Sequence, residues 1–428
     1  MNSSSKAPRL RRELGVFGAT MLGLGSIVGT GVFVSIGIGA EAAGPSVLLA
    51  IALASLLAIC NGLSSAQLAA NHPVSGGTYE YGHKWLSPWL GFTAGWMFLG
   101  AKSASAATAA LGFAGYLLQA IDQKDTIWLP GVAAAAVVVL TVISLCGVQR
   151  SSTANVVIVA VTLLSLTFFV VVGGGACGSP GQRLTPFFAG GGAGLLQATA
   201  LMFVAYTGYG RIATLGEEVR EPQTTIPRAV IVTLAVSMVL YVSVAFVAVA
   251  TVGAEAFAQT THQQAAPLET IASRFPVFGS ATVLAVGAIT AMLGVLLNLL
   301  LGLSRVLLAM GRRNDAPAGL AAVSERSGSP WAATLTMAAV VSGLALLGDV
   351  RLTWSFSALT VLVYYALTNL CALRLRPEER LFSIWPTYCG LAGCVFLAFW
   401  IDGAAWLIGG GFAAVGCLWR LLWRSQAA

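Results

Sequence analysis

Continuous apolar runs separated by short polar clusters make up most of the chain. A helix needs about 20 apolar residues to cross the hydrocarbon core of a bilayer, and runs of this length recur along the sequence. They lack the alternation of apolar and polar positions that marks the strands of a membrane barrel. The pattern therefore predicts an all-α, polytopic membrane protein of about 12 transmembrane helices. The expected spans are residues 15–38, 45–67, 87–120, 127–147, 153–175, 192–216, 228–252, 277–303, 331–348, 354–373, 384–401 and 404–421.

Composition excludes a soluble globular protein. Of the 428 residues, 57% are hydrophobic and only 9% are charged, whereas charged residues make up about 25% of a typical soluble domain. The 23 Lys and Arg exceed the 16 Asp and Glu, and in a membrane protein this excess indicates loop orientation rather than a nucleic-acid partner. The seven cysteines have no CxxC spacing, so neither a disulfide framework nor a metal site is expected.

Lys and Arg are distributed unequally between the two sides of the expected spans. If residues 1–14 form a cytoplasmic tail, 17 of the 23 lie in cytoplasmic segments, and four lie outside: Lys124, Arg183, Arg274 and Arg351. Cytoplasmic loops of membrane proteins carry the excess of positive residues. We therefore expect both termini to lie on the cytoplasmic side of a plasma or inner membrane. Residues 422–428 would form a short cytoplasmic tail.

Glycine clusters interrupt two of the expected spans. Residues 25–33 read GSIVGTGVF in the first span, and residues 203–211 read FVAYTGYGR in the sixth. Taken singly, each cluster favours close helix packing through small residues. Two broken helices five spans apart instead indicate an inverted repeat that holds a substrate at the midplane. Residues 15–175 and 192–373 would be the two five-helix repeats, and residues 384–421 would be two additional helices.

A nucleotide cofactor is not expected at the first cluster. The glycines of residues 23–29 resemble a dinucleotide fingerprint, but the third glycine is displaced and no strand precedes the segment. No other cofactor is predicted from the sequence.

Five motifs in order resemble those of the amino acid–polyamine–organocation transporters. They are GSIVGTGVF at 25–33, PVSGGTYEY at 73–81, EEVREPQTTIPR at 217–228, SRVLLAM at 304–310 and YYALTNLCALR at 364–374. The resemblance covers nearly the whole chain. It implies a five-plus-five inverted repeat with broken helices 1 and 6, two further helices, and an amino acid as the small-molecule substrate.

The resemblance also implies a binding site made largely of backbone groups. The substrate carboxylate would meet the N–H groups of Gly29, Thr30 and Gly31, because a helix N-terminus offers unpaired donors and partial positive charge. The ammonium would face carbonyl groups freed at the two breaks. The residues expected to line the site are Ser26, Ile27, Gly29, Thr30, Gly31, Lys102, Phe203, Val204, Tyr206, Thr207 and Gly208.

Ionisable residues are almost absent from the interior of the expected spans. All 16 carboxylates fall in loops or near span ends, and Lys102 lies well inside the third span. Intramembrane lysines tend to face cavities and serve function, although the stem could also snorkel to a headgroup. Some members of the resembled family carry a lysine on helix 5, where this chain has Thr162. We therefore expect Lys102 to supply that charge from helix 3. Desolvation would favour the neutral form of its amine, and transport would then be coupled to protons.

The further candidates for coupling or gating are Thr162, Tyr209, Arg211 and Asn298. Arg211 could form a structural ion pair with Glu218, or an inner gate whose pairing breaks when the site opens. Tyr209, like Tyr206, could close the pocket or simply pack. Asn298 could be a polar group of the pocket or an interhelical contact. Trp354 is expected in the aromatic belt at the membrane interface.

These observations predict a secondary active transporter that moves an amino acid by alternating access. Two intramembrane cations and no carboxylate favour a neutral substrate, while an aromatic cage could still hold a cation. A cationic amino acid or polyamine transporter and a non-transporting amino-acid sensor therefore remain alternatives. An enzyme is not expected, because the expected spans show no buried nucleophile with a base and no cluster of metal ligands. Proton coupling and exchange both stay open.

Overall fold

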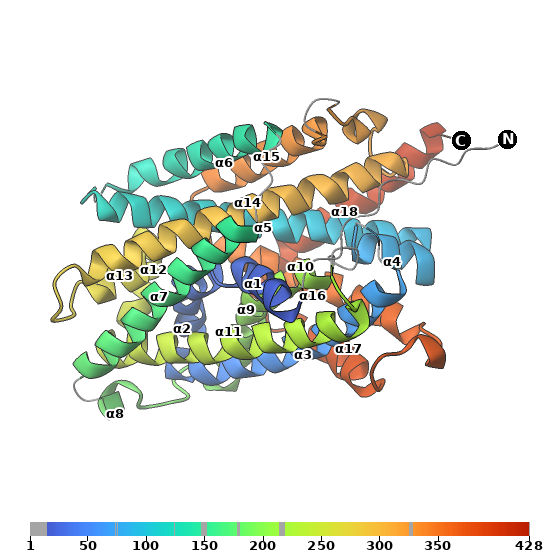
Figure 1. The fold of residues 1–428 in the computed structure, drawn as a ribbon. Helices are drawn as coiled ribbons and strands as arrows, with labels where there is room; N and C mark the ends of the chain where they lie inside the picture. The colour runs from blue at the N-terminus through green and yellow to red at the C-terminus, as the bar shows by residue number, and fades with distance from the viewer. Residues whose placement is uncertain are drawn as a thin grey trace.

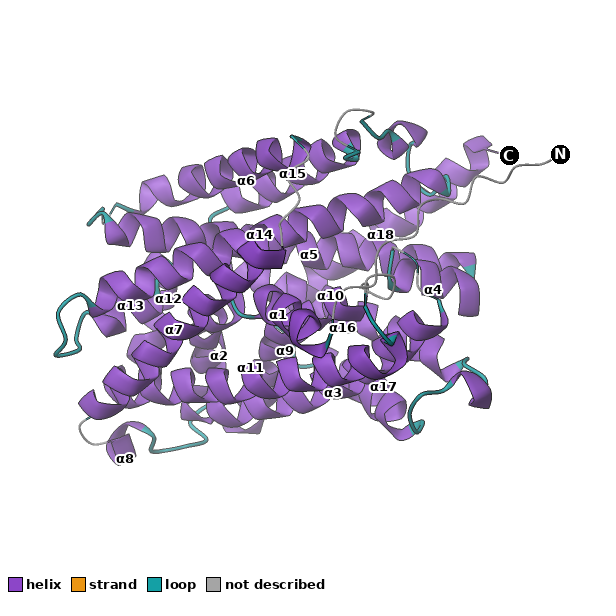
Figure 2. Ribbon diagram, in the orientation of Figure 1, coloured by secondary structure: helices purple, strands orange, loops and turns teal. Residues whose placement is uncertain are grey.

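The computed structural model describes residues 15–72, 74, 76–123, 125–146, 152–177, 180–213, 219–324 and 328–427. Within these ranges the protein is helical and contains no β-strand (Figure 2). Figure 1 shows long helices that run in one general direction. Helices α6 and α15 lie along one edge of the bundle, α3 and α17 lie along the other, and α1 and α9 lie between them.

The chain forms long helices linked by short helical turns. The helices longer than ten residues are α1 (Val16–Ile27), α3 (Val47–Asn71), α5 (Pro88–Ala120), α6 (Leu129–Leu145), α7 (Ser152–Ala176), α9 (Gly191–Tyr206), α11 (Pro222–Val252), α12 (Ala254–Gln264), α14 (Ser280–Arg312), α15 (Trp331–Leu346), α16 (Val350–Leu373), α17 (Trp385–Ala398) and α18 (Gly403–Ala427). The shorter elements used below are η1 (Gly31–Ser35), α2 (Ile36–Ala43), α4 (Thr78–Trp85), η4 (Thr207–Tyr209), α10 (Gly210–Ala213) and α13 (Pro267–Ala272).

The all-helical, membrane-embedded class predicted from the sequence is confirmed. Each expected span overlaps at least one helix, and seven helical segments of the described chain are long and apolar enough to cross a membrane. Some helices extend beyond the expected spans. Helix α11 begins at Pro222 rather than at residue 228, because proline is tolerated in a first helical turn, and α14 continues to Arg312 rather than ending at 303. The count of twelve spans and the inverted repeat stay predictions.

Helix α5 packs against both α14 and α16 in the interior of the bundle. Its buried middle is rich in Ala, Ser and Gly, and small residues let neighbouring helices approach closely. Hydroxyl pairs join α5 to α16: Ser105 Oγ lies 2.7 Å from Ser357 Oγ, and Thr108 Oγ1 lies 2.8 Å from Thr353 Oγ1. These neutral contacts satisfy buried polar groups without placing a charge in the bilayer.

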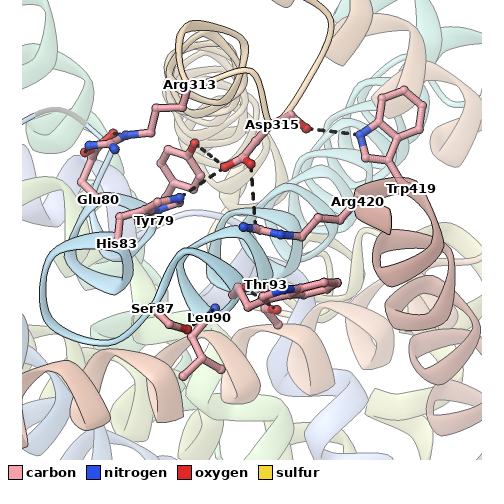
Figure 3. A network of polar contacts seen from close by, with 11 residues as sticks. Tyr79, Glu80, His83, Ser87, Leu90, Thr93, Arg313, Asp315, Trp419 and Arg420 are labelled. Atoms are coloured by element: carbon pink, nitrogen blue, oxygen red, sulfur yellow. Dashed lines mark hydrogen bonds and ion pairs between the residues drawn. The ribbon is translucent and has the colours of Figure 1, made fainter. Parts of the chain in front are cut away.

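A cluster of polar residues joins α4, the segment after α14, and α18 (Figure 3). The hydroxyl of Tyr79 donates to Asp315 Oδ2 at 2.9 Å, and His83 Nε2 lies 3.3 Å from the same oxygen. Arg420 Nη1 lies 3.8 Å from Asp315 Oδ1, and both side chains are about 1% exposed. The guanidinium also lies over the Trp89 ring, 4.8 Å from its centroid. The last helix is thereby fixed to the rest of the bundle by a buried charge pair.

The Asp315 carboxylate is ionised because of these neighbours. Burial alone would raise its pKa, but hydrogen bonds from His83 and Tyr79 and the charge of Arg420 outweigh burial, so the pKa of Asp315 lies below its usual value. A depressed pKa means that ionised Asp315 stabilises the fold at pH values above the pKa that this residue has in the unfolded chain. This contribution is lost as the pH falls through the lower folded value.

We expect Asp315→Asn to destabilise the protein by about 3–5 kcal/mol, because it leaves the Arg420 charge buried without its partner. Thermal unfolding in detergent at neutral pH measures the effect. Glu378→Gln on an exposed turn is the control and should unfold like the wild type. The difference in unfolding temperature between Asp315→Asn and the wild type should become smaller as the buffer is acidified. Equal unfolding temperatures at neutral pH would contradict this account of the cluster.

Candidate functional site

The first helix is interrupted in its middle. Helix α1 ends at Ile27, Val28 takes an extended conformation with ψ of 99°, and helical geometry resumes with η1 and α2. The N–H groups of Val32 and Phe33 both donate to the Gly29 carbonyl, so the second helical segment starts at Gly29. The N–H groups of Gly29, Thr30 and Gly31 thus lie in the first turn of this segment, where they have no partner within their own helix and the helix dipole adds partial positive charge.

The second interruption lies against the first. Helix α9 ends at Tyr206 and gives way to the 3₁₀ turn η4 and the short helix α10. A Cβ atom placed on Gly208 would lie 2.3 Å from the carbonyl oxygen of Ser26. A Cβ on Gly31 would lie 2.7 Å from that of Ala205. Glycine at 31 and 208 therefore lets two broken backbones come into direct contact.

A cavity of about 780 Å³ opens at these two breaks and extends toward α4 and the end of α14. Ten of the residues predicted for the site line this cavity: Ser26, Ile27, Thr30, Gly31, Lys102, Val204, Thr207, Gly208, Arg211 and Asn298. Five others do not line it: Gly29, Thr162, Phe203, Tyr206 and Tyr209. Glu80 and Arg313 lie toward its other end.

Thr30 also presents its hydroxyl group in this first turn. Its side chain is 4% exposed and lines the cavity, and its Oγ1 has no hydrogen-bond partner among the described residues. A buried hydroxyl without a partner costs free energy unless something else binds it. The Thr30 hydroxyl and the N–H groups of 29–31 together form a set of donors for an anionic group.

Lys102 reaches from α5 to the second break. Its Nζ donates to Thr207 Oγ1 at 2.7 Å, and the Thr207 hydroxyl donates to the Val204 carbonyl at 2.8 Å. Tyr365 donates to the Thr207 carbonyl at 3.3 Å. The amine therefore lies at the interrupted helix, and the described residues place no carboxylate in an ion pair with it.

The predicted aromatic residues pack around the breaks. The Tyr206 ring lies 5.2 Å from that of Tyr241, and the rings of Phe203 and Tyr209 lie 5.6 and 5.4 Å from that of Tyr365. Tyr241 also donates to the Ile27 carbonyl at 2.8 Å. One of the carbonyls expected to meet a ligand ammonium thus already accepts a hydrogen bond from the protein.

The remaining predicted residues have different surroundings. Asn298 Nδ2 lies 3.5 Å from the Gly25 carbonyl, so it joins α14 to α1 and also lines the cavity. Thr162 donates to the Ile158 carbonyl of its own helix at 2.8 Å. Arg211 lies on α10 at the cavity wall, and its expected partner Glu218 lies outside the described residues.

Trp354 was wrongly predicted to lie in the interfacial belt. It is 2% exposed, its indole Nε1 donates to the Leu201 carbonyl at 3.0 Å, and it lines the cavity. A position near a helix end is typical of belt residues, but the helical face decides burial, and this face of α16 points into the bundle. Ser105, Tyr364 and Tyr365 also line the cavity and were missed. Their only signal in the sequence was a polar or aromatic residue within an apolar span.

Comparison with known proteins gives consistent matches over most of the chain. The family model described as "Amino acid permease" matches residues 18–410. An uncharacterized transporter of Mycobacterium tuberculosis is 42% identical over 415 residues, covering 95% of this chain and 91% of the relative. A branched-chain amino acid permease of Bacillus subtilis is 28% identical and covers 95% and 90%. A vacuolar cationic amino acid transporter of Arabidopsis thaliana is 27% identical and covers 86% and 64%.

The contact between the two breaks can be tested with a matched pair of substitutions. Gly208→Ala places a methyl group against the Ser26 backbone, whereas the nearest atom to a Cβ at Gly210 is the Tyr365 hydroxyl, 3.4 Å away. We expect Gly208→Ala to destabilise the protein by about 1–3 kcal/mol through overpacking. Gly210→Ala should have little effect. Thermal unfolding of both variants in detergent measures the difference, and equal unfolding temperatures would contradict the described contact.

Proposed function

Because the chain belongs to the amino acid permease family, we propose that it binds an amino acid between its two interrupted helices and moves it across the membrane by alternating access. The protein is an integral membrane transporter and not an enzyme. The observation that carries the proposal is the set of donors at the first break: the first-turn N–H groups that follow it and the unpartnered Thr30 hydroxyl.

These donors suit the α-carboxylate of an amino acid. A carboxylate accepts several hydrogen bonds at once, and charge-assisted bonds are about twice as strong as neutral ones. The N-terminal end of η1 adds its dipole. A binding site of this kind needs no arginine, so the anion can be released again when the helix segments move.

The ammonium group has acceptors on the other side of the break. Ser26, in the last turn of α1, lines the cavity together with Val204. Helix α1 ends there, and the C-terminal end of a helix attracts cations. A zwitterion bound across the break would thus have both charges satisfied by main-chain groups, as in other transporters with discontinuous helices.

The charges around the cavity favour a neutral amino acid. Lys102, Arg211 and Arg305 line it, and the acidic residue that lines it, Glu80, is already paired with Arg313. An additional positive charge on the substrate would find no free carboxylate among the described lining residues. The relatives bear names of both kinds, a branched-chain permease and a cationic amino acid transporter, so the substrate panel below includes arginine and lysine.

The topology we propose has twelve spans. Residues 15–175 and 192–373 form the two inverted repeats, residues 384–421 add two helices, and the tails at 1–14 and 422–428 are cytoplasmic. The Lys and Arg bias supports this orientation, and in it the cavity extends toward the cytoplasmic side, beside α4 and the end of α14. The structure would then represent the inward-open state in a plasma or inner membrane.

Lys102 has a separate role in this proposal. Its hydrogen bond to Thr207 joins α5 to the second break, so loss or gain of a proton at this amine would change how firmly the broken helix is held. Burial favours the neutral form of a lysine. Proton coupling through Lys102 follows from this arrangement, with exchange of one amino acid for another as the alternative.

Reconstitution into liposomes tests the proposed function. Flux of radiolabelled leucine, valine, alanine, arginine and lysine would be measured with and without imposed pH and sodium gradients. We expect saturable flux of a neutral amino acid. Binding without flux would indicate a sensor instead, and neither binding nor flux of any amino acid would overturn the proposal.

Thr30→Val tests the carboxylate site, because it replaces the hydroxyl by a methyl group of the same size. Loss of a hydrogen bond to a charged group costs about 1.5–3 kcal/mol, so we expect the substrate KM to rise by about 10- to 100-fold. The control is Thr290→Val on α14, a partly exposed residue outside the cavity whose hydroxyl donates to the Val286 carbonyl of its own helix. Unchanged substrate affinity in Thr30→Val would remove Thr30 from the site.

Lys102→Ala tests the coupling role. We expect the variant to lose most of the dependence of uptake on an imposed pH gradient, because the titrating amine is gone. Uptake by counterflow, which needs no gradient, would separate loss of coupling from loss of folding. Lys84→Ala, which removes a lysine lying over the Trp85 ring, is the control. Unchanged uptake with unchanged pH dependence in Lys102→Ala would exclude this role.

A further inference from the structure

A buried carboxylate lies at the end of the bundle opposite the cavity mouth. Figure 1 shows α12 and α13 at one end of the molecule and α4 at the other. Glu269 on α13 is 5% exposed, and its Oε2 atom is buried with no hydrogen-bond partner among the described residues. An ionised carboxylate in this position would lose its hydration without compensation.

Helix α13 is seated on the segment that follows the first break. The Tyr116 hydroxyl accepts a hydrogen bond from the Leu268 backbone N–H at 3.3 Å and donates to the Phe33 carbonyl at 2.9 Å. The Phe33 and Tyr116 rings also contact edge to face, 5.8 Å apart. One phenol therefore joins α13, η1 and α5, and its single proton is already used in the bond to Phe33.

No positive charge compensates Glu269 among the side chains that the structure describes. Helix α13 packs against α11, α12, α14 and η1, and the Tyr116 phenol is the titratable group that faces the carboxylate. Glu255 and Arg274, the charged residues nearest in the chain, are exposed. Burial raises the pKa of Glu269 to about 8, so the carboxyl group is protonated at neutral pH. Helix α12 also carries His262, which the experiment below controls for.

We infer that Glu269 is a proton-binding site that controls the seating of α13 on η1, and hence closure of the transporter at this end. The inference rests on the proposed function, because η1 belongs to the helix half that must move in alternating access. The neutral acid can remain buried, whereas the ionised form must reach water and draws α13 away from η1. Protonation from the water on this side thus favours closure.

The proton bound here is not carried across the membrane. The cavity that opens at the other end does not include Glu269, so the proton returns to the side from which it came. The site therefore makes transport sensitive to the pH on the α13 side alone. In this respect it differs from Lys102, which lies on the cavity itself.

The protonation state can be measured without any substrate. Infrared spectra of the purified protein would be compared between the wild type and Glu269→Gln. We expect a carboxylic-acid C=O band at neutral pH in the wild type that fades as the pH rises through about 8. The band should be absent in Glu269→Gln and retained in Glu255→Gln and His262→Gln. Absence of the band from the wild type, or its survival in Glu269→Gln, would overturn the inference.

Transport in proteoliposomes gives the second readout. With the pH on the cavity side fixed, raising the pH on the α13 side through that range should slow wild-type uptake several-fold. Uptake by Glu269→Gln should not depend on the pH of the α13 side, and its dependence on the pH of the cavity side should be unchanged. Its thermal unfolding should match that of the wild type. A wild-type profile in Glu269→Gln would overturn the inference. Absence of all amino acid flux in the wild type would instead overturn the proposed function, and the infrared titration would still decide the protonation of Glu269.

Discussion

Lipid supplies no hydrogen bonds, so each backbone N–H and C=O within a bilayer must find its partner inside the protein. The interruptions after Ile27 and after Tyr206 depart from this requirement, and they do so beside each other, with Gly208 against the Ser26 carbonyl. The start of the second helical segment is tolerated there because Thr30 and Gly31 border a cavity rather than lipid. The remaining helices serve to hold these two breaks in register.

The walls around the breaks are held by neutral contacts. Hydroxyl pairs such as Ser105–Ser357 join α5 to α16, and Asn369 Nδ2 donates to Asn61 Oδ1 at 2.6 Å to join α16 to α3. Such contacts fix the helices without strong long-range fields. Lys102 and Arg211 are the cationic residues that line the cavity near the second break, and of these two Lys102 is the one whose charge can change with its proton.

The sequence predicted the fold class and both breaks because these follow from local composition: apolar run length and glycine spacing. It also identified Lys102, since a charge within an apolar run is conspicuous. The prediction that Trp354 lies in the interfacial belt was wrong, because hydropathy does not say which face of a helix is buried. Glu269 and Asp315 were dismissed as loop residues for a related reason. Their burial involves residues distant in sequence: Arg420 of α18 lies against Asp315, and Tyr116 of α5 lies against α13 and Glu269.

The two ends of the molecule are held together by different kinds of contact. At the cavity mouth, Arg313 Nε donates to Glu80 Oε1 at 3.0 Å, and the Arg313 side chain is 46% exposed. At the far end, the Tyr116 hydroxyl contact is buried. Dissolved electrolyte screens exposed charges over about 8–10 Å but scarcely reaches buried dipoles. Ionic strength should therefore loosen one end of the transporter and leave the other untouched, so that a salt difference between the two compartments biases the conformational cycle.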